Sequence, residues 1–516
     1  MKRRKFLKVT SGLSAVAAIS PSALAKATEK KKPNLLIIMT DEHNFRTLGC
    51  YRKTLPVDQA YIWGKGNAVE TPNIDSIAAD GVLCTNFYST SPVCSPARGS
   101  FMSGLYPQNT PVVTNDIPLG DEVTTFAKIL GENGYKTGYS GKWHLDGVGK
   151  PQWGPKRQFG FDDNRFMFNR GHWKVLMDTP DGPKVKTDSK GKPSYDIKGA
   201  NEKTFTTDWL TDKAVDYIEE HKNESFCYMV SYPDPHGPDT VRAPYDKMYT
   251  HMKFEKPKTA SKPTANVPTW AQPKKGGAND SQYFGMIKCI DDNIKKILDS
   301  LKKNNLLDDT IVIFTSDHGD LRGEHGRQNK GTILEASAKV PFLVRYPAKI
   351  KKGDLVREAL GGVDFLPTVL SLMNIETSVG EGRDVSPLLT GNKPTDWDDM
   401  IVSRGTKSWN WVSSVSKRYK LVLSPQDEPW LIDKLKDPDE LENFCNNPEY
   451  RSIVRKLGQG MLAYHEQYKD PSLNVPKVAF DLKWAAGNSG AYDAANAPQV
   501  KTPKTTGKKK GKKRKK

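Results

Sequence analysis

The chain has 516 residues and a formal net charge of +18, which on its own would suggest a polyanion-binding protein. Its length leaves room for two or three domains and a large core. The excess charge lies at the ends, because residues 1–25 carry five basic groups, residues 501–516 carry ten, and neither segment has an acid. Subtracting these fifteen charges leaves +3 for the rest, so charge gives no reason to expect a nucleic-acid partner. No run of about 20 apolar residues is present, so no membrane span is expected.

The N-terminal segment has the pattern of an export signal. Lys2 to Lys8 include a pair of arginines, an apolar stretch follows from Val9 to Ile19, and Ala23 to Ala25 offers a small-residue cleavage site. We therefore expect residues 1–25 to be a twin-arginine-type signal peptide. The mature protein is then expected to be periplasmic or extracellular.

The first predicted strand of the mature chain ends in acidic residues. Asn34 to Thr40 is a nearly continuous apolar run, typical of a strand buried in a parallel sheet, and Asp41 and Glu42 follow it directly. Open α/β sheets bind ligands at the carboxyl ends of their strands. Two adjacent acids in this position predict metal ligands.

The segment around Cys94 predicts an anion site. A strand is expected from Val82 to Tyr88, and the residues after Cys94 are expected to begin a helix, since proline is favoured near a helix start. Cys94 would then lie at or just before a helix N-terminus, where backbone N–H groups and the helix dipole favour an anion. Arg98, at i+4, would point back to the same place. The six cysteines form no C-x-x-C pair, so Cys94 is not expected in a disulfide framework or a zinc site.

Three later predicted strands also end in polar residues. The strands are expected at Tyr135 to Ser140, Phe226 to Tyr232 and Asp309 to Thr315. The polar residues that follow them are Lys142 and His144, then His236, then Asp317 and His318. Lys142 and His144 alternate with Trp143, so they are expected to point the same way. A further strand is predicted at Val340 to Tyr346, and helices are predicted at Thr124 to Glu132, Thr207 to His221 and Ser281 to Lys303.

The remaining segments have weaker patterns. Residues 146–200 are expected to form a long insert over the site, and its candidates for contacting substrate are Trp153, His172 and Trp173. Residues 253–276 are rich in Pro and Lys and are expected to be a surface loop or linker. Short strands and a helix predict a smaller α+β domain at 400–480. Residues 485–516 have little apolar content and are expected to be a disordered, Lys-rich tail.

Cys94-Ser95-Pro96-Ala97-Arg98, followed by Gly-Ser-Phe-Met-Ser-Gly-Leu-Tyr-Pro, resembles the signature of the formylglycine-dependent sulfatases of the alkaline-phosphatase-like superfamily. The other motifs follow in the order of that family, from about residue 33 to residue 470. The resemblance implies an α/β catalytic domain at 33–395 with a large, mostly parallel central sheet and helices on both faces. It also implies hydrolysis of a sulfate ester by a formylglycine (3-oxoalanine), which a maturation enzyme makes from Cys94.

The resemblance also implies roles for single residues. The residues at the metal positions of the family are Asp41, Glu42, Cys94, Asp317 and His318, and such oxygen-rich sets suit Ca²⁺, with Mg²⁺ as the alternative. The residues at its catalytic positions are Cys94, Arg98, Lys142, His144, His236 and Lys330. In the implied reaction the hydrated aldehyde attacks sulfur, and His236 with Lys330 protonates the leaving alcohol. His144 then helps the second hydroxyl to expel sulfate, which regenerates the aldehyde.

Two residues depart from the family pattern. Glu42 stands where the family usually has Asp or an amide, and Leu334 stands where a Tyr often precedes Glu335. An exported enzyme with a long insert is expected to act on a sulfated polysaccharide or oligosaccharide. The alternatives are a phosphonate or phosphodiester hydrolase of the same superfamily, and a secreted polyanion-binding protein that uses the Lys-rich tail.

Overall fold

The computed structural model describes residues 32–261, 267–274, 276–406, 410–487 and 491–498. The predicted signal peptide at 1–25 and most of the predicted tail at 485–516 lie outside these residues. None of the helices in the described part is long and apolar enough to cross a membrane.

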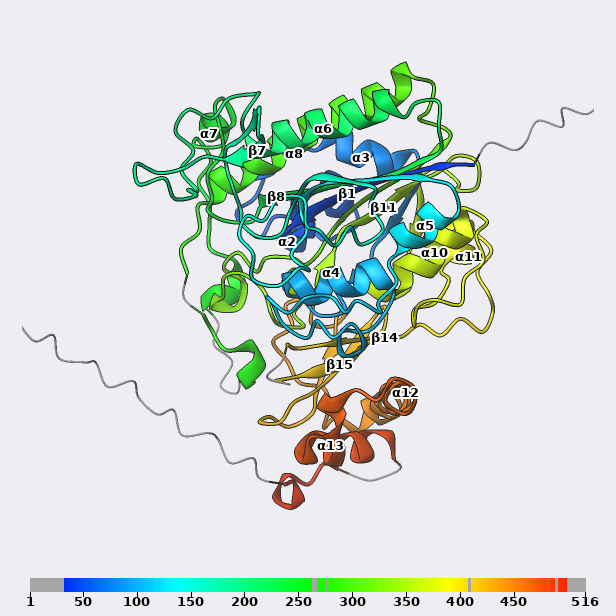
Figure 1. Cartoon of the computed structure of the whole chain (residues 1–516). Helices are drawn as coiled ribbons and strands as arrows, with labels where there is room; N and C mark the ends of the chain where they lie inside the picture. The colour runs from blue at the N-terminus through cyan, green and yellow to red at the C-terminus, as the bar shows by residue number, and fades with distance from the viewer. Residues whose placement is uncertain (1–31, 262–266, 275, 407–409, 488–490, 499–516) are drawn as a thin grey trace, which may run out of the picture. The chain divides into compact units, whose positions relative to one another are not determined.

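An eight-stranded sheet in the order β12-β2-β11-β9-β1-β8-β4-β5 forms the centre of the fold (Figure 1). Its strands are β1 (Asn34–Asp41), β2 (Val82–Cys84), β4 (Lys136–Lys142), β5 (Asp163–Phe168), β8 (Phe226–Pro235), β9 (Thr310–Ser316), β11 (Phe342–Arg345) and β12 (Asp354–Val356). Neighbouring strands run parallel except where β11 pairs with β9 and with β2. The predicted fold class, a large and mostly parallel sheet, is confirmed.

Helices cover both faces of this sheet because its central strand is apolar on both sides (Figure 1). Leu35, Ile37 and Met39 of β1 face one core, while Leu36 and Ile38 face the other. The first core contains residues of α4 (Cys94–Ser103), α5 (Phe126–Glu132) and α10 (Phe365–Leu372). The second contains residues of α3 (Pro72–Ala79), α6 (Thr206–Glu220) and α8 (Asp280–Lys303).

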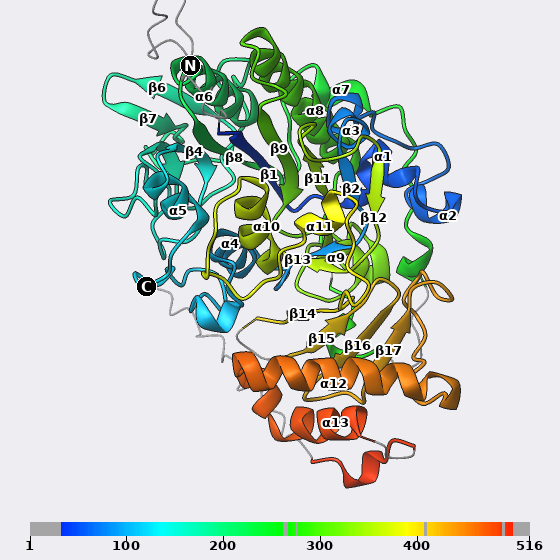
Figure 2. The same cartoon turned by 90° about the vertical axis from the view of Figure 1, so that its right-hand side faces the viewer.

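The C-terminal region contains an antiparallel sheet with two helices beside it (Figure 2). Its strands and helices are β14 (Ile401–Arg404), β15 (Val412–Val415), β16 (Tyr419–Leu423), β17 (Trp430–Asp433), α12 (Arg451–Tyr468) and α13 (Pro476–Ala486). This is the smaller α+β part that the sequence predicts. Residues 491–498, within the predicted tail, include a 3₁₀ turn, and the Tyr492 ring lies 5.0 Å from that of Trp484.

The remaining elements are short. They are α1 (Gly49–Arg52), α2 (Val57–Ala60), α7 (Tyr245–Met248), α9 (Glu335–Ala338), α11 (Ser386–Leu389), the sheet β10-β3-β13 (Lys339–Val340, Phe87–Tyr88, Leu360–Gly361) and the hairpin β6-β7 (Leu176–Thr179, Gly182–Val185).

Two sequence predictions about strands were wrong in detail, and the 146–200 insert contains strands that were not predicted. The strand predicted from Val340 to Tyr346 is two strands, β10 and β11, separated at Pro341, which has no N–H for a ladder. The strand predicted from Val82 to Tyr88 divides at a turn into β2 and β3, which belong to different sheets. The 146–200 insert is not irregular throughout, because it contributes β5 to the central sheet and also forms the β6-β7 hairpin.

Gly141 provides a test of how tightly β4 is fixed against β8. Its φ is 98°, and a Cβ at this position would lie 2.0 Å from the Ser231 carbonyl oxygen. We therefore expect Gly141→Ala to lower the free energy of unfolding by at least about 2 kcal/mol. The measurement is denaturant unfolding. Gly131→Ala is the control, since a Cβ at position 131 would meet no described atom within 4 Å beyond its own helix, and it should change stability by less than about 1 kcal/mol.

Candidate active site

The candidate site lies where four parallel strands end at one edge of the sheet. Neighbouring strands β9, β1, β8 and β4 carry Asp317, Asp41, His236 and Lys142 at or just beyond their carboxyl ends. The predicted positions of these polar residues are therefore confirmed. Their side chains come together because parallel strands present their carboxyl ends at the same edge.

Cys94 enters this edge from the first residue of α4. Pro96 occupies the first turn of that helix, as expected, and Cys94 is 2% exposed. Its Sγ lies 3.2 Å from Nε2 of His318 and 3.8 Å from Oδ1 of Asp41. The nucleophile predicted from the motif therefore lies beside two of the predicted metal ligands.

Arg98 connects the strand ends beneath Cys94. Its Nε donates to Oδ2 of Asp317 at 2.9 Å, and its Nη2 donates to Oδ2 of Asp41 at 3.2 Å. Its Nη1 also donates to the Lys142 carbonyl and to the Ser231 hydroxyl, both at 2.8 Å. All these groups are fully buried, so the guanidinium is the cation that compensates two carboxylates in the interior.

A second group of charged side chains lies beside the first. Oε2 of Glu42 is 2.9 Å from Nε2 of His236 and 3.1 Å from Nζ of Lys330, and these two nitrogens are 2.7 Å apart. The backbone of Glu42 has a left-handed φ of 65°, and Tyr283 donates to its carbonyl at 2.9 Å. Glu42 thus contacts the two residues that the sequence predicts as the general-acid pair.

His172 is a site residue that the sequence indicated only weakly, as one of three aromatic side chains in an aperiodic insert. Its ring stacks on that of His236 with centroids 3.6 Å apart, and its Nε2 lies 2.9 Å from Nζ of Lys142, which also binds Asp41. The other two candidates in the insert pack against neighbouring aromatic rings. Trp173 is buried against Tyr195, and Trp153 packs on Phe168.

His144 is positioned by its own backbone conformation and by Asp116. It has a left-handed φ of 62°, so the simple alternation with Lys142 does not hold, and its Nε2 contacts Oδ1 of Asp116 at 3.3 Å. Its carbonyl accepts a hydrogen bond from the Ser95 hydroxyl at 2.8 Å, next to Cys94. Neither Asp116 nor Ser95 had a signal in the sequence that marked it.

The cations at this edge favour an ionised thiol at Cys94 and an ionised carboxyl at Asp41, whereas burial and the neighbouring Asp41 raise the pKa of Asp317. Burial and Asp41 oppose ionisation of Cys94, but Lys142, Lys330 and His318 hold the pKa of its thiol well below the usual range. Burial likewise opposes ionisation of Asp41, yet Lys142 above all holds the pKa of that carboxyl well below its usual range. The site is therefore a pocket of compensated charge that suits a polar, anionic ligand.

The donor set fits a divalent cation. Ligand atoms of Asp41, Cys94, Asp317 and His318 all lie within 4.8 Å of one another, and all four residues are buried. The Nδ1 of His318 lies 3.0 Å from the Gly319 carbonyl oxygen, a contact that directs Nε2 toward the group. Two carboxylates suit Ca²⁺ or Mg²⁺, and an oxygen in place of the Cys94 sulfur would suit them better. Glu42 does not belong to this set.

Comparisons with known proteins decide the family. The sequence profile named Sulfatase matches residues 33–375, and the profile for the C-terminal region of N-sulphoglucosamine sulphohydrolase matches residues 323–467. The chain belongs to the sulfatase family. The resemblance seen in the sequence is thereby confirmed, and the protein is a sulfuric ester hydrolase.

Named relatives of this sulfatase align over most of their length. The uncharacterised sulfatase YidJ of Escherichia coli is 27% identical, over 86% of this chain and 88% of its own. The N-acetylglucosamine-6-O-sulfatase of Bacteroides thetaiotaomicron is 27% identical, over 88% of this chain and 90% of its own. A structure solved in complex with its substrate D-glucosamine-2-N,6-O-disulfate has a TM-score of 0.70 at 24% identity, covering 86% of this chain and 99% of that one, which shows a common fold.

The buried contacts of Arg98 give a stability test of the sulfatase site. Arg98→Ala would leave two buried carboxylates without their shared cation, so we expect the free energy of unfolding to fall by about 3–5 kcal/mol. Arg165→Ala is the matched control, because Arg165 pairs with Asp163 from a side chain that is 65% exposed, and its loss should cost less than about 1 kcal/mol. Equal values for the two variants in denaturant unfolding would contradict the assigned role of Arg98.

Proposed function

We propose that this sulfatase is an exported enzyme that hydrolyses sulfate esters of a polysaccharide or oligosaccharide, using a formylglycine made from Cys94. The observation that carries the proposal is the position of Cys94: at a helix N-terminus, 3.2 Å from His318 and surrounded by Lys142, Arg98 and Lys330. The carbohydrate class is supported by the named relative that acts on an N-acetylglucosamine sulfate.

The residues of the chain divide the reaction between them. A formylglycine at position 94, once hydrated, would supply one hydroxyl as the nucleophile for sulfur and a second hydroxyl whose deprotonation would release sulfate and restore the aldehyde. Arg98 holds the two strand ends in place, and Lys142 compensates negative charge at Asp41. Asp41, Asp317, His318 and residue 94 would hold a divalent ion, which would supply Lewis-acid stabilisation of negative charge.

The alcohol leaves on the side of His236 and Lys330. Glu42 fixes both of these side chains by contacts of 2.9 and 3.1 Å, and the stacked His172 ring restricts the rotation of His236. We assign His236 with Lys330 as the general acid that gives the leaving oxygen its proton. His144, held by Asp116, is assigned to removing the proton of the second hydroxyl.

The nature of residue 94 is tested by mass spectrometry. Co-expression with a formylglycine-generating maturation enzyme should lower the mass of the peptide containing Cys94 by about 18 Da, the difference between thiol and aldehyde. The modified protein should hydrolyse sulfated glycans such as N-acetylglucosamine 6-sulfate or ulvan oligosaccharides, and Cys94→Ala should be inactive. If the protein hydrolyses only phosphonate or phosphate diesters, it is instead a phosphonate or phosphodiester hydrolase of the same superfamily.

Glu42 is tested by varying the leaving group. If Glu42 positions His236 and Lys330, Glu42→Gln should lower kcat/KM for a sulfated sugar by about 100-fold, because the sugar alcohol is a poor leaving group that needs a general acid. The same variant should lower kcat/KM for 4-nitrophenyl sulfate far less, because 4-nitrophenol is a good leaving group. The affinity for Ca²⁺, followed by thermal shift, should stay within about threefold of the unmodified site. A large loss of Ca²⁺ affinity with equal losses on both substrates would make Glu42 a metal ligand, as the sequence pattern predicts.

A further inference from the structure

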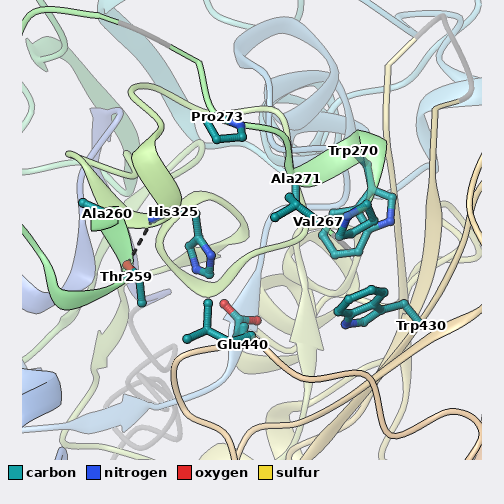
Figure 3. A pocket seen from close by; sticks show the side chains of 11 residues that line it. Thr259, Ala260, Val267, Trp270, Ala271, Pro273, His325, Trp430 and Glu440 are labelled. Carbon is teal, nitrogen blue, oxygen red and sulfur yellow. Dashed lines mark hydrogen bonds between the residues drawn. The ribbon is translucent and has the colours of Figure 1, made fainter. Parts of the chain in front are cut away.

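A cavity of about 260 Å³ lies outside the sulfatase site, lined by residues 259–260 and 267–273 on one side and by the C-terminal region on the other (Figure 3). Two indoles, of Trp270 and Trp430, stand on one side of it with ring centroids 6.4 Å apart and nearly perpendicular planes. Thr259, His325 and Glu440 supply polar groups on the other sides. We call this cavity the tryptophan pocket.

The polar side of the tryptophan pocket is held in place by the protein. Glu440 Oε1 accepts from Nζ of the buried Lys420 at 2.7 Å, and its Oε2 accepts from the Glu335 N–H at 2.7 Å. The backbone N–H of His325 donates to the Thr259 hydroxyl at 3.1 Å. These fixed groups are preorganised, so a ligand would not bear the entropy cost of ordering them.

The backbone of the pocket is strained at two of its three polar residues. His325 and Glu440 each have a φ of 54°, in the left-handed region that non-glycine residues rarely adopt. Such conformations persist where the surroundings impose them, and they concentrate at sites that hold ligands. The two residues come from segments more than a hundred positions apart, so local turn chemistry does not account for their meeting in one cavity.

The lining restricts the class of ligand. None of the eleven described residues that line the pocket is Lys or Arg, and the buried Lys420 behind Glu440 is already paired with Glu440 and Glu335. A sulfate or carboxylate would therefore meet no free cation among these residues. A purely apolar ligand would offer no acceptor to the Thr259 hydroxyl and no polar partner to the His325 ring. The indole N–H of Trp270, a residue only 4% exposed, also has no hydrogen-bond partner in the described part of the chain.

We propose that the tryptophan pocket binds one uncharged pyranose ring of a carbohydrate chain. A pyranose has a face of C–H groups that packs on indole and a rim of hydroxyls that both donate and accept hydrogen bonds, which matches the two sides of this cavity. The volume is smaller than that of a typical site for a drug-sized ligand and suits a single ring. The statement that this ring belongs to the same glycan as the sulfate ester rests on the proposed function. The binding of a pyranose in the pocket does not depend on it.

The position of the pocket relates it to catalysis through one loop. His325, in the 3₁₀ turn Glu324–Gly326, precedes Lys330 in the same loop, and the Gly326 carbonyl accepts from the Lys274 N–H at 3.2 Å. A carbohydrate chain held in the pocket would therefore contact the loop that carries Lys330. An unsulfated unit of a polymer would be recognised here, while a sulfated unit enters the site at Cys94.

Binding is tested with neutral hexasaccharides on the full-length protein. Cellohexaose, neoagarohexaose and N-acetylchitohexaose are titrated calorimetrically into the wild type and into Cys94→Ala, and at least one should bind both proteins equally. Trp430→Ala should weaken that binding by about tenfold or more. Trp397→Ala is the matched control, since Trp397 is also half-buried with an unpartnered indole N–H but does not line this pocket, and it should bind as the wild type does.

Three results would overturn the proposal. The first is that none of the three probes binds at about 10 mM, a concentration at which even a weak site is filled. The second is that Trp430→Ala and the wild type bind a probe equally well. The third is that a sulfated monosaccharide displaces the bound probe. Thermal unfolding of Trp430→Ala checks its fold, and Trp430→Phe, which keeps a ring but lacks the N–H, should bind with an intermediate affinity and serves if the alanine variant does not fold.

The catalytic consequence separates this proposal from the proposed function. Trp430→Ala should raise KM for a sulfated polysaccharide while kcat/KM for a sulfated monosaccharide stays unchanged. If no sulfate ester is hydrolysed by any variant, the proposed function fails, and the titration of neutral hexasaccharides still decides whether the tryptophan pocket binds sugar.

Discussion

The arrangement of the site depends on one buried cation. Arg98 reaches from the second turn of α4 to carboxylates at the ends of two neighbouring strands, Asp41 on β1 and Asp317 after β9. Without it, the two acids would repel each other in an interior with little screening. The same guanidinium also donates to the Lys142 carbonyl and the Ser231 hydroxyl, so it joins β4 and β8 as well. Cys94, one turn earlier on α4, is thereby held in register with all four strand ends.

Much of this could be predicted from the sequence because two simple regularities apply. Continuous apolar runs identify buried parallel strands, and the polar residues after them must gather at one edge of the sheet. Asp41, Lys142, His236, Asp317 and His318 all follow from this rule, and Arg98 follows from helical spacing. These predictions needed no knowledge of how distant segments pack.

What could not be predicted depends on distant packing. Glu42 contacts His236 and Lys330 because its backbone is left-handed and Tyr283 of α8 holds its carbonyl. Neither feature leaves a local pattern in the sequence. His172 reaches the site from an insert without periodicity, where its neighbours Trp153 and Trp173 pack elsewhere. Likewise, Trp270, His325 and Glu440 become neighbours only through the docking of the C-terminal region.

The burial of the cysteines affects how readily oxidants react with the folded protein. All six are free and buried, and burial raises the pKa of Cys50, Cys84, Cys227, Cys289 and Cys445, which keeps these five as protonated thiols. Cys94 is the exception whose surroundings favour the reactive thiolate. If the proposed aldehyde replaces that sulfur, none of the five remaining cysteines is an activated sulfhydryl, so peroxide and disulfide exchange would have no reactive thiol in the folded chain.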